Sequence, residues 1–201
     1  MANVIPTKGN LMAIKRSLSL ARLGFDLMDR KRNILIREMM SLIDRATEIQ
    51  GRIDSVFRDA YASLQQANIT LGHCADIAQC VSLDESLQIH HRSVMGVEIP
   101  RVSMEDKPFS NPYGFAFTNS MLDNATLQFI RVKQLICELA EVETSIYRLA
   151  FAIKKTQKRA NALSNIIIPG FTADVSVITD ALEEKDREEF VRLKVIKAQS
   201  G

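Results

Sequence analysis

The residues best suited to chemistry are few and lie close together in the chain. His73 precedes Cys74, Cys80 follows six residues later, and His90-His91 form a pair. This spacing matches neither the CxxC nor the HExxH pattern of zinc sites, so we expect no metal. Cys74 and Cys80, at the end of a first helix, are interpreted as small buried residues. The histidines make no nucleophile-and-base set and no GxxxxGK[ST] loop is present, so we predict no catalytic residue and no cofactor.

Basic residues are the second group that could bind a partner. They form two clusters, Arg30-Lys31-Arg32 and Lys154-Lys155 with Lys158-Arg159. A nucleic-acid patch is one interpretation, but neither cluster has interleaved aromatic residues. The formal net charge is only +2, from 26 Lys and Arg against 24 Asp and Glu. A solvated helix face is the simpler interpretation, and we expect no nucleic-acid partner.

Composition limits the class of protein. The 201 residues are 46% hydrophobic and 25% charged, which excludes a disordered chain. Trp is absent and aromatic residues are 6%, so the core is expected to be Leu, Ile, Met and Ala, as between two paired helices. Three cysteines are too few for a disulfide framework and fit a reducing cytoplasm. The chain starts without a signal-peptide pattern and has no run near 18 apolar residues, so no direct membrane insertion is expected.

Two long stretches, 7–99 and 113–168, contain no proline and carry heptad spacing. In the first, fourteen of fifteen positions that follow three- and four-residue steps are apolar, the exception being Arg32. These fifteen are Leu11, Ile14, Leu18, Ala21, Phe25, Met28, Arg32, Leu35, Met39, Leu42, Ala46, Ile49, Ile53, Val56 and Ala60. Sustained heptads predict a coiled-coil helix of about 100 Å. Arg32 is expected to reach water or Asp29 along its own helix.

The second stretch repeats the spacing, with Thr156 as its one polar member. Its positions are Val132, Leu135, Leu139, Val142, Ile146, Leu149, Ile153, Thr156, Ala160, Leu163 and Ile167. Between the two stretches, β-branched residues and turn residues around Pro108, Pro112 and Gly114 indicate a small β-hairpin and loop. We therefore predict a mainly α fold: an antiparallel two-helix coiled coil with a β-hairpin insertion at the bend. Its parts are an N-terminal helix (1–78), the insertion (79–120) and a C-terminal helix (121–201) interrupted near 169–170.

An antiparallel arrangement also predicts which residues face each other. If the insertion is the bend, the numbers of facing residues sum to about 195, which places Gly24 opposite about residue 171. The same register places the basic region 8–37 beside the acidic segment 174–189. Opposite charges beside paired helices would fix their register.

The two ends of the chain resemble a known family, the D subunits of V-type and archaeal A-type rotary ATPases. The N-terminal features are Pro6-Thr7, Ile14-Lys15-Arg16, Ala21-Arg22-Leu23-Gly24, Leu27-Met28 and Lys31-Arg32. The C-terminal features are Thr156, Arg159, Asn161-Ala162-Leu163 and Ile168-Pro169, followed by an acidic run and Arg192-Leu193-Lys194. Together these motifs cover about half of the chain, and 93–100 matches loosely.

The resemblance implies a non-catalytic rotor shaft that transmits torque between the nucleotide-processing hexamer and the membrane ion-translocating ring. Its partners would be the hexamer of catalytic (A) and non-catalytic (B) subunits, the small F subunit of the central stalk, and the funnel-shaped subunit on the membrane rotor ring. Its place would be cytoplasmic, peripheral to the membrane through the complex. The complex would couple ion transport, such as hydrogen ion transport, to ATP synthesis or hydrolysis.

Exposed basic residues near the two ends are the expected contacts with those partners. They are Lys15, Arg16, Arg22, Arg30, Lys31, Lys154, Lys155, Lys158 and Arg159. Solvated charges of this kind contribute little each, which suits a shaft that must slide. Two alternatives come from other classes: a non-rotary coiled-coil scaffold, and a prefoldin-like hairpin chaperone. The chaperone would need exposed apolar helix tips.

Overall fold

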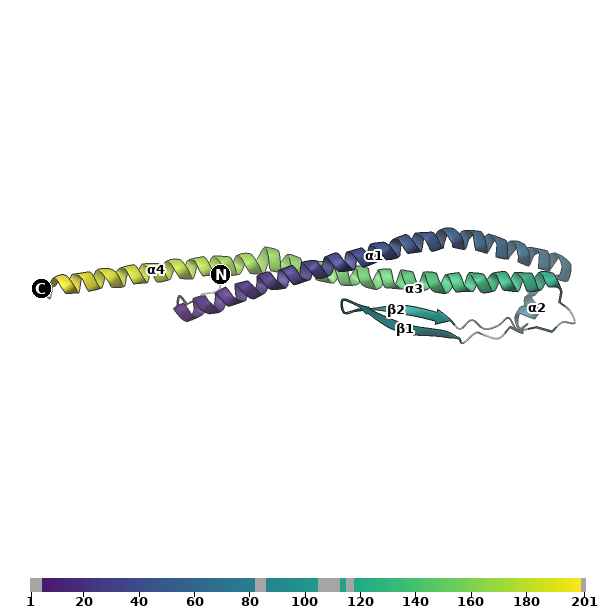
Figure 1. Cartoon of the computed structure of the whole chain (residues 1–201), viewed down its shortest axis with the longest axis horizontal. Helices are drawn as coiled ribbons and strands as arrows, with labels where there is room; N and C mark the ends of the chain where they lie inside the picture. The colour runs from purple at the N-terminus through teal and green to yellow at the C-terminus, as the bar shows by residue number, and fades with distance from the viewer. Residues whose placement is uncertain (1–4, 82–85, 105–112, 115–117, 200–201) are drawn as a thin grey trace. The chain divides into compact units, whose positions relative to one another are not determined.

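The fold is mainly α, with two long helical segments and a two-stranded antiparallel hairpin between them, as the sequence predicts (Figure 1). This computed structural model describes residues 5–81, 86–104, 113–114 and 118–199. The elements in chain order are α1 (Lys8–Leu71), α2 (Ala75–Ala78), β1 (Leu87–Val94), β2 (Val97–Met104), α3 (Ser120–Ala162), the π-helical turn η2 (Leu163–Ile167) and α4 (Ile168–Gln199).

Contacts divide the chain into two compact units. Unit 1 comprises Met1–Asn33 and Ile153–Gly201, and unit 2 comprises Ile34–Ala152. The helix α1 contributes residues to both units, as does α3. Each unit has its own buried stripe between antiparallel helices.

Unit 2 buries the predicted apolar stripe of α1 against that of α3. Ala46, Ile49 and Val142 form one cluster, and four half-buried side chains pack around it: Leu42, Ile53, Leu139 and Ile146. Leu35, Ala60 and Leu149 are completely buried. All of these belong to the heptad positions, so the period of the sequence identified the contact face correctly.

Unit 1 has its own buried contacts between the helices. Ala21 and Ala160 are buried, as is Ile178. Arg32, the charged residue on the stripe, forms an ion pair with Asp29, as predicted. It also donates a hydrogen bond from Nη1 to Gln157 Oε1 at 3.0 Å, a contact between the two helices that sequence reasoning missed.

At Gly24 the predicted register was wrong by about two helical turns. A Cβ at Gly24 would lie 3.9 Å from Leu163 Cδ1, so Gly24 faces Leu163 and not residue 171. The reason is the length of α1, which ends at Leu71, where Gly72 takes a φ of +77°. A glycine in this conformation terminates a helix, and its N–H donates to the Asn68 carbonyl at 2.9 Å. At the start of α1 the prediction agrees with the structure: Lys8 and Asp186, whose numbers sum to 194, form an ion pair at 3.7 Å between the basic and acidic regions.

The irregularity in the C-terminal helix lies just before the proline. The π-helical turn Leu163–Ile167 precedes α4, and Pro169 and Gly170 both lie within the first turn of α4. Proline has no N–H to donate, and the first turn of a helix tolerates that loss. The wider turn therefore lets the helical path continue through Pro169.

A small apolar cluster closes the bend in unit 2. Cys74 is buried with Ala67, Tyr113 and Leu122, and the half-buried Leu71 and Ile77 pack against them. Asn119 begins α3 by accepting the Leu122 N–H at 3.1 Å, and its amide donates to Thr70 Oγ1 at 2.7 Å. Burial of Cys74 was predicted, but Cys80 is exposed, because it follows α2 on the solvent side. Pro108 and Pro112 lie outside the described residues.

The hairpin has a two-residue turn. Val94 pairs with Val97, and the pairing continues to Leu87 and Met104. Met95 and Gly96 both have positive φ, 51° and 74°, which is the geometry of a type I′ turn. This turn matches the right-handed twist of the strands and fixes their register.

Burial along the stripe predicts a large difference between two leucines of α1. Leu35 is 0% exposed and Leu20 is 68% exposed. Leu35→Ala should lower the free energy of unfolding by about 2–5 kcal/mol, because it removes packed atoms and leaves a cavity. Leu20→Ala makes the same chemical change on the surface and should change it by less than about 0.5 kcal/mol. Urea unfolding measures both; equal losses would mean that the stripe is misassigned.

The Tyr113 phenol predicts a loss of stability at high pH. Burial raises its pKa, the Asp123 charge adds to the rise, and the hydrogen bond with Thr126 opposes it. The unfolded chain therefore loses this proton first, so the stabilisation is complete below about pH 10 and is lost as the pH rises through the folded-state value.

Tyr113→Phe should thus be less stable at neutral pH by about 1 kcal/mol and show a smaller decline above about pH 10. Urea midpoints across a pH series measure this decline. Tyr147→Phe, at an exposed position, is the control. An alkaline decline in Tyr113→Phe as steep as in the unmodified chain would exclude Tyr113 as its source.

Candidate functional site

All nine predicted basic contact residues lie in unit 1. Five come from α1 and four from α3, and eight are exposed while Lys31 is half-buried. Counted at 3.6 residues per turn, some of them flank the buried stripe and the others lie on the opposite face of the helix. The structure describes no side-chain hydrogen bond or ion pair for any of them. These charges are thus available to a partner.

The outer face of α1 in unit 1 also carries an apolar stripe, which sequence reasoning missed. Met12, Leu20, Leu23 and Leu27 are all more than half exposed. Their spacing of three, four or eight residues places them on one side of the helix, interleaved with Arg16 and Lys31. Contiguous exposed apolar side chains with basic residues between them are typical of a protein-binding surface.

The end of α4 is a second exposed apolar surface of unit 1. Every residue from 183 to 199 is exposed, and five of them are large and apolar: Phe190, Val191, Leu193, Val195 and Ile196. Lys8, at the start of α1, contacts Asp186, so these five lie past the last contact described between the two helices. These apolar side chains are distributed around the helix, and a helix end that is apolar on several sides favours burial by a partner.

The continuous helical stretch Ser120–Gln199 contains one 18-residue window with a mean hydropathy of 1.4, of which 6% is buried. By length and composition alone such a window could cross a membrane, a property that was not predicted from the sequence. Exposed Ile166, Ile167 and Val177 contribute to the apolar surface of this stretch. The window thus adds a third exposed apolar area in unit 1.

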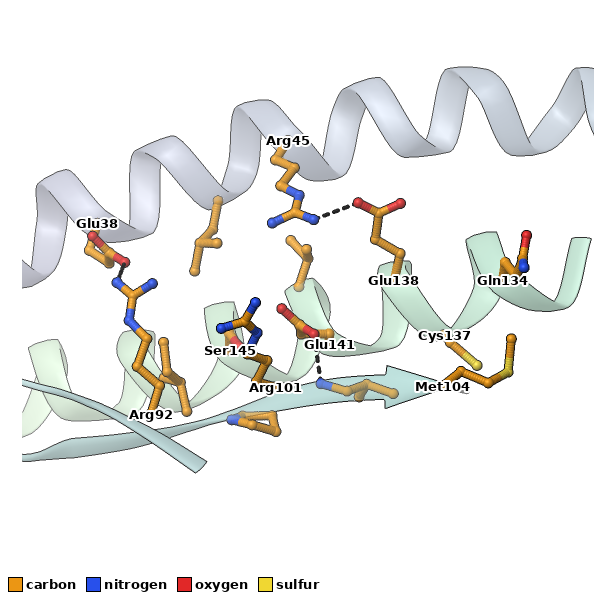
Figure 2. Close-up of a pocket in the computed structure, with 15 residues that line it drawn as sticks. Glu38, Arg45, Arg92, Arg101, Met104, Gln134, Cys137, Glu138, Glu141 and Ser145 are labelled. Carbon is orange, nitrogen blue, oxygen red and sulfur yellow. Dashed lines mark hydrogen bonds and ion pairs between the residues drawn. The ribbon is translucent and has the colours of Figure 1, made fainter. Parts of the chain in front are cut away.

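In unit 2, the hairpin is attached to the helices by polar contacts around a groove (Figure 2). Arg92 of β1 contacts Glu38 of α1 at 2.6 Å. The N–H of Val102 in β2 donates to Glu141 Oε2 of α3 at 2.7 Å, and Arg148 of α3 donates to the Glu98 carbonyl at 3.1 Å. Buried Ile99 and Pro100 supply the apolar part of this attachment.

The groove has a volume of about 680 Å³, and its charges largely satisfy one another. Arg45 and Glu138, facing each other from α1 and α3, pair at 2.5 Å, and this hydrogen bond is the main cause that raises the pKa of Arg45. Within the described part of the chain, no group of three or more His, Cys, Asp or Glu could hold a metal ion. His90 and His91 are exposed on β1, outside the groove lining. The groove therefore lies at the interface where the hairpin packs against α1 and α3.

The contact between Val102 and Glu141 predicts local protection of one amide. Glu141→Ala should raise the hydrogen-exchange rate of the Val102 N–H about tenfold, because a hydrogen bond to a charged acceptor is worth about 1.5–3 kcal/mol. Glu143→Ala, an exposed position two residues along α3, is the matched control and should leave that rate unchanged. If the rate stayed the same in Glu141→Ala, Glu141 would not be the acceptor in solution.

Comparison with known proteins places this arrangement in one family. The family model that describes the D subunit of ATP synthase matches residues 10–198. The V-type ATP synthase D subunit of Thermotoga neapolitana is 43% identical over 97% of this chain and 97% of its own length. The A-type ATP synthase D subunits of Thermococcus sibiricus and Methanosphaera stadtmanae are 34% and 36% identical, over 97% and 96% of this chain and 94% and 92% of theirs. The chain belongs to the family of ATP synthase D subunits.

Proposed function

We propose that this chain is the central rotor shaft of a V- or A-type rotary ATPase. In this role it carries out no chemistry and transmits torque between the nucleotide-processing hexamer and the ion-translocating ring of the membrane. The observation that carries the proposal is the surface of unit 1. Exposed apolar and basic side chains alternate on α1, and the end of α4 exposes five large apolar side chains. Unit 1 is the part that enters the hexamer.

The surface of unit 1 has the chemistry that a rotating contact needs. Apolar side chains such as Leu20, Leu23 and Leu27 are attractive to a partner without fixing one orientation, because the hydrophobic effect is non-directional. The interleaved charges are solvated and weak one by one. A socket of protein around unit 1 would bury the apolar area and still let the shaft change its angle.

Packing within each unit supplies the resistance to twisting. The buried stripe prevents one helix from sliding along the other, since each side chain is held between residues of the opposite helix. Polar contacts beside the stripe also join the two helices. Arg32 bonds to Gln157 in unit 1, and Arg45 pairs with Glu138 in unit 2. A torque applied to one helix would therefore be carried by both.

The two helices present different side chains, so the shaft is asymmetric. An asymmetric shaft inside a hexamer with three catalytic interfaces would meet each of them differently. It would act as a ligand with a different affinity for each nucleotide state, and turning it would shift those states in order. The F subunit of the central stalk and the funnel-shaped subunit would bind elsewhere along the chain, on the cytoplasmic side of the membrane.

One observation supports the hairpin-chaperone alternative, and another opposes it. The open apolar end of α4 is a feature that such a chaperone would need. The match to the D-subunit family, however, extends over nearly the whole chain, and the relatives cover it at 97% and 96%. We therefore retain the rotor shaft as the proposed function.

The proposal predicts that the outer apolar stripe is needed for assembly with the hexamer. Leu20→Ser combined with Leu27→Ser should lower recovery of the tagged chain with the purified cognate hexamer about tenfold or more, as expected when a contact worth about 1.4 kcal/mol or more is lost. Both leucines are exposed, so the chain itself should stay folded. Pull-down with quantified subunit bands, together with the ATPase rate of the hexamer, measures the effect.

Ile69→Ser is the matched control. Ile69 is on the same helix and is 83% exposed, but belongs to unit 2. This variant should bind the hexamer as the unmodified chain does. A double variant that still binds and still changes the ATPase rate would contradict the assignment of unit 1 to the hexamer.

A further inference from the structure

We propose that the π-helical turn η2 is a joint, at which α4 can turn about its own axis by one residue between two packings against α1. In the packing that the structure shows, Ile178 is completely buried. In the second packing, Val177 would take its place. The turn, α4 and the part of α1 concerned all belong to unit 1, and the proposal rests on which residues are buried before and after the turn.

The turn holds one residue more than the heptad pattern of the chain requires. Thr156 and Ile178 are both buried and are 22 residues apart, one more than three heptads. Val177, the residue that three heptads from Thr156 would bury, is 64% exposed. The Ile168 N–H bonds to the Leu163 carbonyl, five residues back, so the extra residue is taken up in η2.

A second apolar stripe lies beside the buried one on α4. Ile167 and Val177 have the places that the heptads of α3 predict, and Ile168 and Ile178 follow each of them by one residue. Ile167 and Val177 are both exposed in the structure. A rotation by one residue would therefore exchange one isoleucine for another at the first place and an isoleucine for a valine at the second.

One charged residue makes the second packing the minor one. Asp174 is in the second stripe, seven residues after Ile167, and Val175 has the corresponding place in the first stripe. Turning the second stripe inward would desolvate the Asp174 carboxylate, which disfavours that packing. The chain therefore rests with Ile178 buried, and the second packing is sparsely populated.

Little opposes the movement at the turn itself. No residue of η2 is buried. On α1 the facing residue is Gly24, and a Cβ there would meet only Leu163 Cδ1 within 4 Å, at 3.9 Å. Pro169 follows the turn and has no N–H, so it removes a main-chain bond that would otherwise hold the α-helical form. A change of hydrogen-bond pattern is therefore easier here than inside a regular helix.

The joint would change the surface that unit 1 presents, and this step rests on the rotor shaft proposed above. An α-helix turns by about 100° per residue, so the second packing would bury Ile167 and Val177 and expose Ile168 and Ile178. A torque or a partner that favours one of these faces would shift the two populations. The two packings themselves are a property of the free chain.

Thiol reactivity of the free full-length chain tests for the second packing. The three native cysteines are replaced by alanine, Ile178→Cys places one thiol at the buried position, and mass spectrometry follows its reaction with iodoacetamide. A buried thiol reacts only when its site opens, so the rate reports the population of the second packing. Ala160→Cys is the control, because it places a thiol at a buried position before the turn.

Asp174→Leu removes the charge that disfavours the second packing. It should raise the reaction rate of Ile178→Cys at least about tenfold and leave that of Ala160→Cys unchanged. Asp180→Leu makes the same chemical change at an exposed position of α4 outside the second stripe and should leave both rates unchanged. If the Ile178→Cys rate fell, or rose equally in Asp174→Leu and Asp180→Leu, the second packing would be wrong.

Deletion of Asn165, which is exposed within η2, should have the opposite effect. It removes the extra residue, so that Ile168 and Ile178 fall on the heptad positions of α3 and a continuous α-helix needs only one packing. The Ile178→Cys thiol should then react at least about tenfold more slowly, while the Ala160→Cys rate stays the same. A deletion that unfolds the chain, or one that leaves the Ile178→Cys rate unchanged, would overturn the joint.

Failure of the joint and failure of the rotor shaft are distinguishable. The joint is read from thiol rates in the free chain, without any partner. The rotor shaft is read from binding to the hexamer and from its ATPase rate. A chain that binds the hexamer with unchanged thiol rates in Asp174→Leu would contradict the joint alone.

Discussion

The fold depends on a narrow strip of contact between two antiparallel helices in each unit. A helix in such a pair buries mainly one side, so most of the remaining surface of α1, α3 and α4 is open to solvent, apart from the sides of α1 and α3 that the hairpin contacts. In unit 2 the strip includes Leu35, Ile49 and Leu149, and in unit 1 it includes Ala21, Ala160 and Ile178. Because so little of each helix is internal, the outer faces are free to evolve for binding.

This constraint explains why so much of the fold could be predicted. Heptad spacing identifies the buried side of a long helix directly, and the residues predicted to face inward are buried or half-buried from Leu11 to Leu163. Ile167 is an exception and is exposed, because the π-helical turn at Leu163–Ile167 rotates the helix face. Periodicity carries no information on such a turn, which depends on the backbone around Pro169.

The register could not be predicted from the spacing, since a stripe with a regular period fits its partner equally well after a shift of one or two turns. The end of α1 decides it, through Gly72 at positive φ and the bond between Thr70 and Asn119. The docking of the hairpin could not be predicted either, because it depends on hydrogen bonds of Glu141 and Arg148 with main-chain groups. A hydrogen bond to the main chain does not depend on the residue type of its partner, so the sequence carries no sign of it.

The candidate surface was found only in part. Charge alone pointed to Arg16, Lys31 and the other basic residues, and all nine are in unit 1. The apolar stripe of Leu20, Leu23 and Leu27 has the spacing of a second helix face and could have been found by continuing the same search on the outer side of α1. A surface that carries both apolar and basic side chains favours contact with a surrounding protein over exposure to water.

Rotation under turnover is the most direct test of the central claim. A bead can be attached at Cys80, which is exposed, after Cys137→Ser removes the half-buried thiol; Cys74 is buried. With the cognate hexamer fixed to a surface, ATP should drive the bead around in one direction, and the bead should stop when ATP is removed. A bead that stays at one angle while the same hexamer hydrolyses ATP with the chain bound would contradict the rotor shaft.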